Sequence, residues 1–215
     1  MKITKYTHAC LVIEDQGQRL VIDPGEWSTD LVDLSNIVAV VVTHVHADHC
    51  DPARIQAIQA ANPTVQIYGP DEVVQHVPAV TPVKASDDIS AGPFRLRFYG
   101  ERHALVHADK PQNQNIGVAV NDTFYYPGDS FTMPQDTQIK ILALPVSGPW
   151  LKLGEAMDFV IAAKPQLCIP THNAMLAEAG MTSVDGWLNN LCAEQGTTYL
   201  RLNPTESTDI SETAA

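Results

Sequence analysis

The chemically richest segment of the chain is residues 43–51, which read THVHADHCD. Three imidazoles and one carboxylate fall within six positions of this segment, on His44, His46, Asp48 and His49. Neutral imidazole nitrogen and carboxylate oxygen are donors that zinc and similar divalent ions accept in proteins. A polar turn that merely contains histidines is the alternative, but four donors this close together favour a metal site.

The elements around this segment predict a rigid setting for it. Residues 37–42 form a continuous apolar run, typical of a buried strand. Asp51 and Pro52 then suit the N-cap and first position of a helix. We therefore expect the donors to occupy a turn between a strand and a helix.

Further donors follow other strand-like runs. His103 comes after residues 94–100, Asp129 after the aromatic residues 123–126, and His172 after the apolar residues 167–169. A sheet-based protein gathers distant residues at one edge in this way, so we expect these side chains to meet the first four.

The order of these motifs resembles the metallo-β-lactamase-fold hydrolase superfamily. The resemblance rests on the HxHxDH pattern at residues 44–49, on the three later donors and on the upstream VIDPG of residues 21–25. It extends from about Met1 to His172. Residues 126–155 are similar to small bacterial, lactonase-like members. The implied fold is an α/β protein, the four-layer αβ/βα sandwich with its metal site along one edge.

The resemblance also implies a binuclear centre. Seven side chains match the ligand positions of the family: His44, His46, Asp48, His49, His103, Asp129 and His172. In the ligand sets of the family, His44, His46 and His103 would hold one ion. Asp48, His49 and His172 would hold the other, and Asp129 would bridge both ions. The expected cofactors are two divalent ions, with zinc favoured and manganese or iron as alternatives. Asp48 and Asp129 are also the candidate catalytic residues.

Two histidines compete for one ligand position. In an extended segment His103 and His107 would lie up to about 13 Å apart, too far to bind the same ion. In a helix their i,i+4 spacing would bring them together. We favour His103, which is nearest the strand end, and expect His107 to line the substrate pocket. Trp150 would either form a wall of that pocket or pack beneath the following helix.

Three other residues near the motifs have less specific roles. We expect His8 to have a packing or ligand-positioning role rather than to bind a metal ion. Asp23 follows an apolar run, and a carboxylate buried there needs a hydrogen-bond partner, for which a ligating histidine is the natural candidate. Alternatively, Asp23 forms the turn before Pro24 and Gly25. The two roles are compatible. Cys50 is interpreted as a small packed residue rather than a soft ligand.

The composition of the chain restricts the classes of substrate and partner that we expect. The 215 residues carry a formal net charge of −12 with only 13 Lys and Arg, which argues against nucleic acid as a substrate. No run is long enough to span a membrane, no signal-peptide pattern is present, and the four cysteines show no framework spacing. We therefore expect a cytoplasmic protein with a small-molecule substrate. The sequence leaves the substrate and the oligomeric state open.

The length of the chain predicts one domain, over residues 1–202, and the polar composition of residues 203–215 predicts a C-terminal tail. Strands are expected near residues 2–6, 9–14, 18–23, 37–43, 65–69, 81–85, 94–100, 115–120, 123–127, 138–144, 166–170 and 197–202. Helices are expected near residues 52–61, 71–77, 152–163 and 183–194. The leading functional hypothesis is a binuclear hydrolase that uses a metal-bridging hydroxide on a small ester or lactone. The alternatives are a metal-dependent phosphodiesterase or nuclease and a non-catalytic metal-binding domain.

Overall fold

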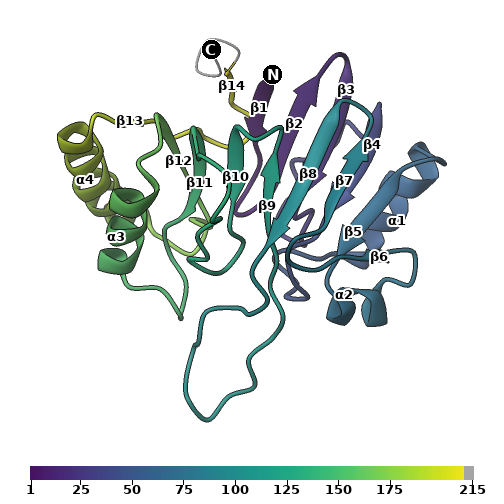
Figure 1. Ribbon diagram of the computed structural model, residues 1–215, viewed down its shortest axis with the longest axis horizontal. Helices are drawn as coiled ribbons and strands as arrows, with labels where there is room; N and C mark the ends of the chain where they lie inside the picture. Colours follow the sequence, from purple (N-terminus) through teal and green to yellow (C-terminus); the bar gives the residue numbers. More distant parts are fainter. Residues whose placement is uncertain (211–215) are drawn as a thin grey trace.

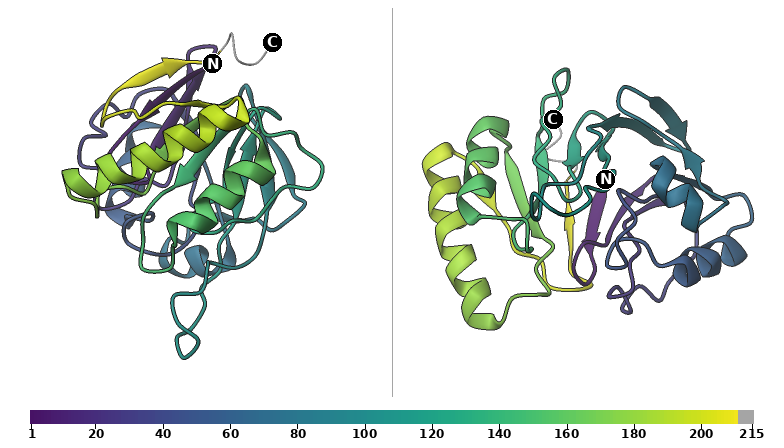
Figure 2. Two further views of the ribbon diagram at one scale, coloured as in Figure 1. Left: turned by 90° about the vertical axis from the view of Figure 1, so that its left-hand side faces the viewer. Right: turned by 90° about the horizontal axis from the view of Figure 1, so that it is seen from below.

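Two β-sheets pack face to face at the centre of the molecule, and helices cover the outer face of each sheet (Figures 1 and 2). The computed structural model describes residues 1–210. The layers follow the order helix, sheet, sheet, helix, so the predicted four-layer αβ/βα sandwich is confirmed.

The N-terminal sheet has the strand order β14-β1-β2-β3-β4-β5-β6. Its strands are β1 (Lys2–Lys5), β2 (Leu11–Asp15), β3 (Gln18–Ile22), β4 (Ile37–Val41), β5 (Gln66–Gly69), β6 (Thr81–Pro82) and β14 (Ser207–Asp209). Pairing is antiparallel from β14 to β3 and parallel from β3 to β6. Parallel neighbours need crossover connections, and helices α1 (Pro52–Ala61) and α2 (Asp71–His76) lie in two of them.

The second sheet has the strand order β13-β12-β11-β10-β9-β8-β7. Its strands are β7 (Asp88–Ala91), β8 (Phe94–Tyr99), β9 (Gly117–Val120), β10 (Phe124–Tyr126), β11 (Ile141–Pro145), β12 (Leu167–Thr171) and β13 (Thr198–Tyr199). Helices α3 (Leu153–Ala163) and α4 (Glu178–Gln195) cover its outer face (Figure 1).

Three apolar clusters fill the three interfaces between the layers. In β11, Ile141 and Ala143 face the cluster between the sheets, whereas Leu142 and Leu144 face α3 and α4. Alternate side chains of a strand point to opposite faces, so a strand that is buried on both faces is continuously apolar. This is why the uninterrupted apolar runs of the sequence mark the central strands.

The turn that carries the first four donors is held as predicted. Asp51 caps α1 by accepting the backbone N–H of Ala53, and Pro52 occupies the first helical position. The loop of residues 100–116, between β8 and β9, projects beyond the ends of the sheets (Figure 1).

The C-terminal prediction needs correction. Ser207–Asp209 form β14, which pairs with β1 at the edge of the first sheet, and Ile210 is fully buried. The polar tail predicted from residue 203 therefore contributes a strand, and residues 211–215 lie outside the described part of the chain. No residue of this edge strand is itself buried, so its sequence has too little apolar pattern to predict a strand. β7 escaped prediction because its apolar pattern is also weak, and α4 starts at Glu178 rather than at residue 183.

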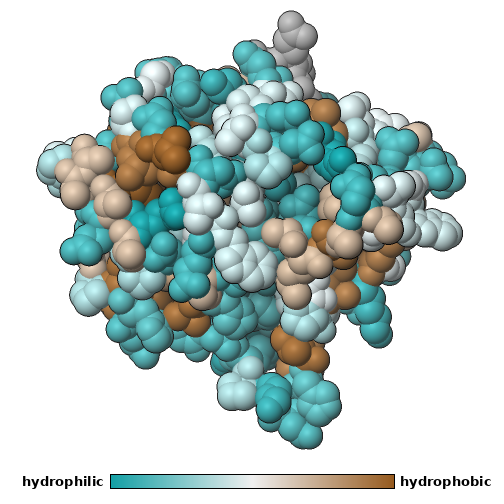
Figure 3. All heavy atoms as spheres, turned by 180° about the vertical axis from the view of Figure 1, so that it is seen from behind, coloured by the Kyte–Doolittle hydropathy of each residue, from teal (hydrophilic) through white to brown (hydrophobic). Residues whose placement is uncertain are grey.

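No helix within residues 1–210 combines the length and apolar character that a membrane crossing requires. The surface in Figure 3 is mostly hydrophilic or neutral, with apolar residues in separate patches.

Candidate metal centre

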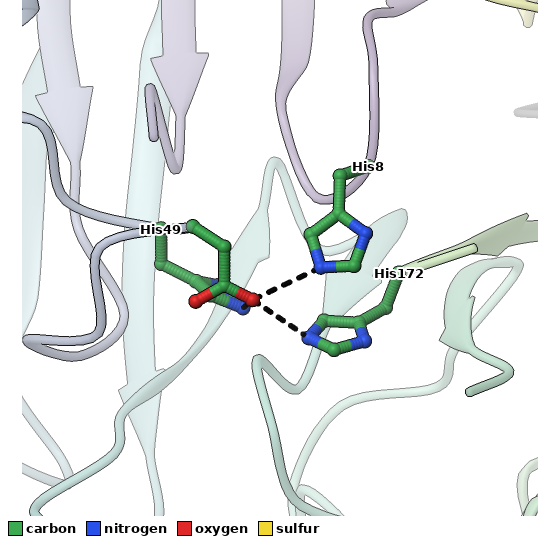
Figure 4. Close-up of side chains that lie close together, drawn as sticks. His8, His49 and His172 are labelled. Carbon is green, nitrogen blue, oxygen red and sulfur yellow. Dashed lines mark hydrogen bonds and ion pairs between the residues drawn. The ribbon is translucent and has the colours of Figure 1, made fainter. Parts of the chain in front are cut away.

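The predicted donors converge at one edge of the sandwich. The turn between β4 and α1 supplies four of them, and the segments that follow β8, β10 and β12 supply His103, Asp129 and His172. In Figure 4, the rings of His8 and His172 both point toward the carboxylate of Asp48, which lies beside His49.

The donors form two groups, and within each group one ligand atom per residue lies within 4.8 Å of the others. The first group is His44, His46, His103 and Asp129, and the second is His8, Asp48, His49 and His172. Asp129 also reaches the second group, because its carboxylate lies 3.3 Å from Nε2 of His49 and 3.1 Å from Nε2 of His172. The side chains expected to hold each ion therefore fall in separate groups, with His8 added to the second group and Asp129 between the two.

The outer ring nitrogens of three histidines have fixed acceptors. Nδ1 of His49 lies 2.7 Å from a carboxylate oxygen of Asp23. Nδ1 of His103 lies 2.6 Å from the carbonyl oxygen of Ala104, and Nδ1 of His172 lies 2.6 Å from that of Ser147. Because these partners can only accept, each Nδ1 carries a proton, and Nε2 is the nitrogen that can offer a lone pair to a metal once its own proton is released.

Those same Nε2 atoms are buried without a hydrogen-bond partner among the described residues, as is Oδ1 of Asp129. Buried polar atoms are almost always satisfied. Three ring nitrogens and a carboxylate oxygen aimed into one space therefore fit divalent cations, and the set of imidazole and carboxylate donors suits zinc, manganese or iron.

The electrostatics of the centre agree with this assignment. Burial, together with the neighbouring ring of His49, holds the pKa of His44 well below its usual value, so this ligand is neutral. For His172, burial opposes protonation, but Asp129 and Asp48 outweigh it and raise the pKa to about 10. Without metal the centre therefore retains protons near its carboxylates, and metal binding would release them.

Asp23 has a histidine of the donor set as its partner, as the sequence suggested, and it also holds the start of the metal-binding turn. Its fully buried carboxylate accepts the backbone N–H and the hydroxyl of Thr43, each at 2.7 Å, besides the ring of His49. Two residues later, Gly25 packs so closely on the carbonyl of Asp48 that any side chain would overlap it.

His8 acts on Asp48 rather than as a free donor. Its Nδ1 accepts the backbone N–H of Ala174 at 3.2 Å, so its Nε2 carries the proton and donates to Oδ2 of Asp48 at 3.0 Å. Burial lowers the pKa of His8 to about 4, which keeps this neutral form at physiological pH. This geometry agrees with the positioning role that the sequence favours.

Trp150 and His107 behave differently from each other. Trp150 is buried, lines the pocket above the donors and donates its Nε1–H to Oδ2 of Asp129 at 2.9 Å. His107 is exposed, lies beside Asp109 and is absent from the pocket lining. This corrects the expectation for His107. Residues 104–113 contain no helix or strand, and the ring of His107 is exposed to solvent there. The neighbouring Val106 lines the pocket instead.

Sequence reasoning missed the link between Trp150 and Asp129. A buried indole N–H requires an acceptor, which was the available signal, but nothing in the sequence indicated which residue would accept it.

The donors open into a pocket of about 280 Å³. His46, Asp48, His103, Asp129 and His172 line its floor. Its walls are largely apolar and come from Trp27, Val106, Pro149, Trp150 and Met175. The centre is therefore accessible to a small molecule.

Known proteins resemble this chain in sequence or in fold. The family described as "Beta-lactamase superfamily domain" matches residues 2–172. Protein Rv0786c of Mycobacterium tuberculosis is 30% identical, covering 96% of this chain and 98% of that protein. UPF0173 protein PF0020 of Pyrococcus furiosus is 25% identical, covering 83% and 86%. The crystal structure of the metallo-beta-lactamase fold protein YhfI from Bacillus subtilis superimposes with a TM-score of 0.74 at 15% identity, covering 96% of this chain and 98% of that one.

Proposed function

This chain belongs to the metallo-β-lactamase superfamily of metal-dependent hydrolases, and from that premise we propose that it hydrolyses a small ester or lactone with two divalent ions. The observation that carries the proposal is the set of unpartnered Nε2 atoms of His49, His103 and His172, aimed at the space around Asp129. His44, His46 and His103 would hold one ion. Asp48, His49 and His172 would hold the other, and Asp129 would contact both.

When bound, two such ions supply hydroxide at neutral pH and polarise a carbonyl oxygen. Neighbouring side chains hold the two carboxylates of the centre in position. The Trp150 N–H holds one oxygen of Asp129, and the His8 N–H holds one oxygen of Asp48. Asp48 lines the pocket with its side chain 20% exposed. We therefore assign it the role of accepting the proton of the attacking water.

The pocket supports carbon rather than phosphorus chemistry. Its lining contains no lysine or arginine, and these are the side chains that bind phosphate oxygens with strong, charge-assisted hydrogen bonds. The net charge of −12 also opposes the approach of a polyanion. A phosphodiesterase or nuclease is therefore the weaker alternative. The accessible pocket above the donors likewise argues against a purely structural metal site.

Metal content and a substrate panel test the proposal together. Protein that has been stripped and reloaded should bind two ions per chain, measured by elemental analysis; saturation at one ion would overturn the binuclear arrangement. The loaded protein should hydrolyse simple lactones and aryl esters and leave structured RNA and bis(p-nitrophenyl) phosphate intact. RNA cleavage that disappears in His172→Ala would reverse the choice of substrate class, because the activity would then come from this centre.

A further inference from the structure

We propose that the substrate carries an uncharged apolar group, a short alkyl or aryl chain, which lies between Trp27, Val106 and Met175 at the mouth of the pocket. The inference deepens the proposed function and rests on it for the position of the scissile bond. The side chains themselves define the apolar subsite.

Exposed apolar side chains gather at this mouth. Of the large hydrophobic residues that are well exposed in the described chain, Trp27 (41% exposed), Val106 (47%) and Met175 (54%) all line the pocket. They come from segments that follow β3, β8 and β12, far apart in the sequence. On the face of the molecule that Figure 3 shows, apolar residues form separate patches on a mostly hydrophilic surface. The convergence of Trp27, Val106 and Met175 on one opening marks a surface for an apolar ligand.

The aromatic side chains of the pocket are held in place by contacts with neighbouring residues. The indole of Trp27 packs on the ring of His8 with centroids 4.5 Å apart, and His8 is in turn anchored to Asp48 and to Ala174. Trp150, on the opposite wall, packs against Phe131 and is tied to the floor of the pocket by its indole N–H. Fixed aromatic walls lose little conformational freedom when a ligand binds.

Charge selects against an anionic substrate tail. The charged groups that line the pocket are Asp48 and Asp129, both assigned to metal binding, and no lysine or arginine accompanies them. A carboxylate or phosphate on a tail that lies between Trp27, Val106 and Met175 would be removed from water without a cationic side chain as a partner, which is costly. The volume of about 280 Å³ is at the lower end of small-molecule sites, so the tail must be short.

A homologous series of lactones measures the subsite. With the zinc-loaded protein, γ-lactones bearing unbranched alkyl chains of one to six carbons should show kcat/KM rising about threefold to fourfold per methylene until the subsite is filled. A lactone whose chain ends in a carboxylate should be at least about tenfold poorer than its methyl-ended counterpart. A flat series, or a preference for the carboxylate, would overturn the inference.

A matched pair of variants locates the effect. Val106→Asp should abolish the advantage of the longer chains, so that the ratio of kcat/KM between the longest and shortest lactones falls to about one. Val32→Asp makes the same change at a residue that is 82% exposed and does not line the pocket, and it should preserve the wild-type ratio. An unchanged ratio in Val106→Asp would show that the chain binds elsewhere.

Binding without turnover separates this inference from the proposed function. The 2-alkylcyclopentanones have no bond to hydrolyse, and calorimetry should show affinity for the loaded protein rising with chain length and falling in Val106→Asp. If these ketones bind in this way but no ester or lactone is hydrolysed, the subsite stands and the proposed function fails. If lactones are hydrolysed but ketone affinity is independent of chain length, the proposed function stands and the subsite is refuted.

Discussion

Replacing Asp23 with asparagine tests how this fold prepares a histidine for metal. In the wild type, Oδ1 accepts the backbone N–H of Thr43, whereas Oδ2 accepts both the Thr43 hydroxyl and Nδ1–H of His49. The amide has one oxygen and one NH₂ group. If its oxygen stays on the backbone N–H, which cannot turn away, its NH₂ faces His49. The imidazole must then accept at Nδ1 and carry its proton on Nε2, so the lone pair aimed at the centre is lost.

The size of the effect follows from the role of such partners. Loss of a group that orients a metal-binding histidine typically costs 10–100-fold in metal affinity, or about 1.4–2.8 kcal/mol. The loss should fall on the ion held by His49, Asp48 and His172. The ion held by the other group should lose less affinity, because none of its three histidines contacts Asp23 directly and only His44 is linked to it, through the Thr43 hydroxyl.

Competition against a chromophoric chelator measures both binding steps. Asp185→Asn is the matched control. Its carboxylate also accepts two strong hydrogen bonds, from the Tyr199 hydroxyl at 2.7 Å and the Arg201 guanidinium at 2.8 Å, but it lies on α4 outside both donor groups. The control should lose some thermal stability and bind both ions normally. Two wild-type affinities in Asp23→Asn, or an equal loss in the control, would refute the reasoning.

Other positions give equally direct tests. His103→Ala should lose one ion by elemental analysis while His107→Ala keeps two, because only the first ring is buried with an unpartnered nitrogen; the reverse result would exchange their roles. Gly25→Ala should lower the free energy of unfolding in urea by roughly 1–3 kcal/mol, since its side chain would overlap a backbone carbonyl of the metal-binding turn, whereas Gly186→Ala has open space and should not destabilise. Burial lowers the pKa of Lys5 to about 8 from 10.5, so the unfolded chain binds this proton more tightly and the residue's contribution to stability rises with pH between those values. The stability of wild type relative to Lys5→Met should therefore increase from pH 8 to 10, and parallel urea midpoints would contradict this.

Local signals explain what the sequence predicted well. The apolar run at residues 37–42, followed by Asp51 and Pro52, combines a buried strand, a cap and a helix start within one short stretch, and α1 has its predicted bounds. Each later donor similarly lies just beyond the carboxyl end of a strand. Parallel strands present these ends at a common edge, so the order of motifs was enough to predict which side chains would meet.

Non-local partners explain what the sequence could not predict. The acceptors that set the protonation of His103 and His172 are the backbone carbonyls of Ala104 and Ser147. A carbonyl oxygen is present at every residue, so no residue type marks these two. The partner of Trp150 is likewise determined by how two loops pack. Pairing of β14 with β1 joins segments that are about 200 residues apart in the sequence, and within the described residues the buried side chain that follows β14 is Ile210.

The metal donors and the residues of the pocket mouth lie on different kinds of segment, and this affects substrate choice. The donors lie close to strand ends that the sheets hold rigidly, whereas Trp27, Val106 and Met175 lie in connecting segments. Such segments tolerate substitution better than the elements they connect. A single charged residue at position 106 would change the character of the pocket mouth without touching a donor. Substrate preference should therefore change independently of metal binding, and Val106→Asp should lose its selectivity for apolar chains while still binding two ions. Loss of an ion in that variant would show that the subsite and the metal centre are not separable.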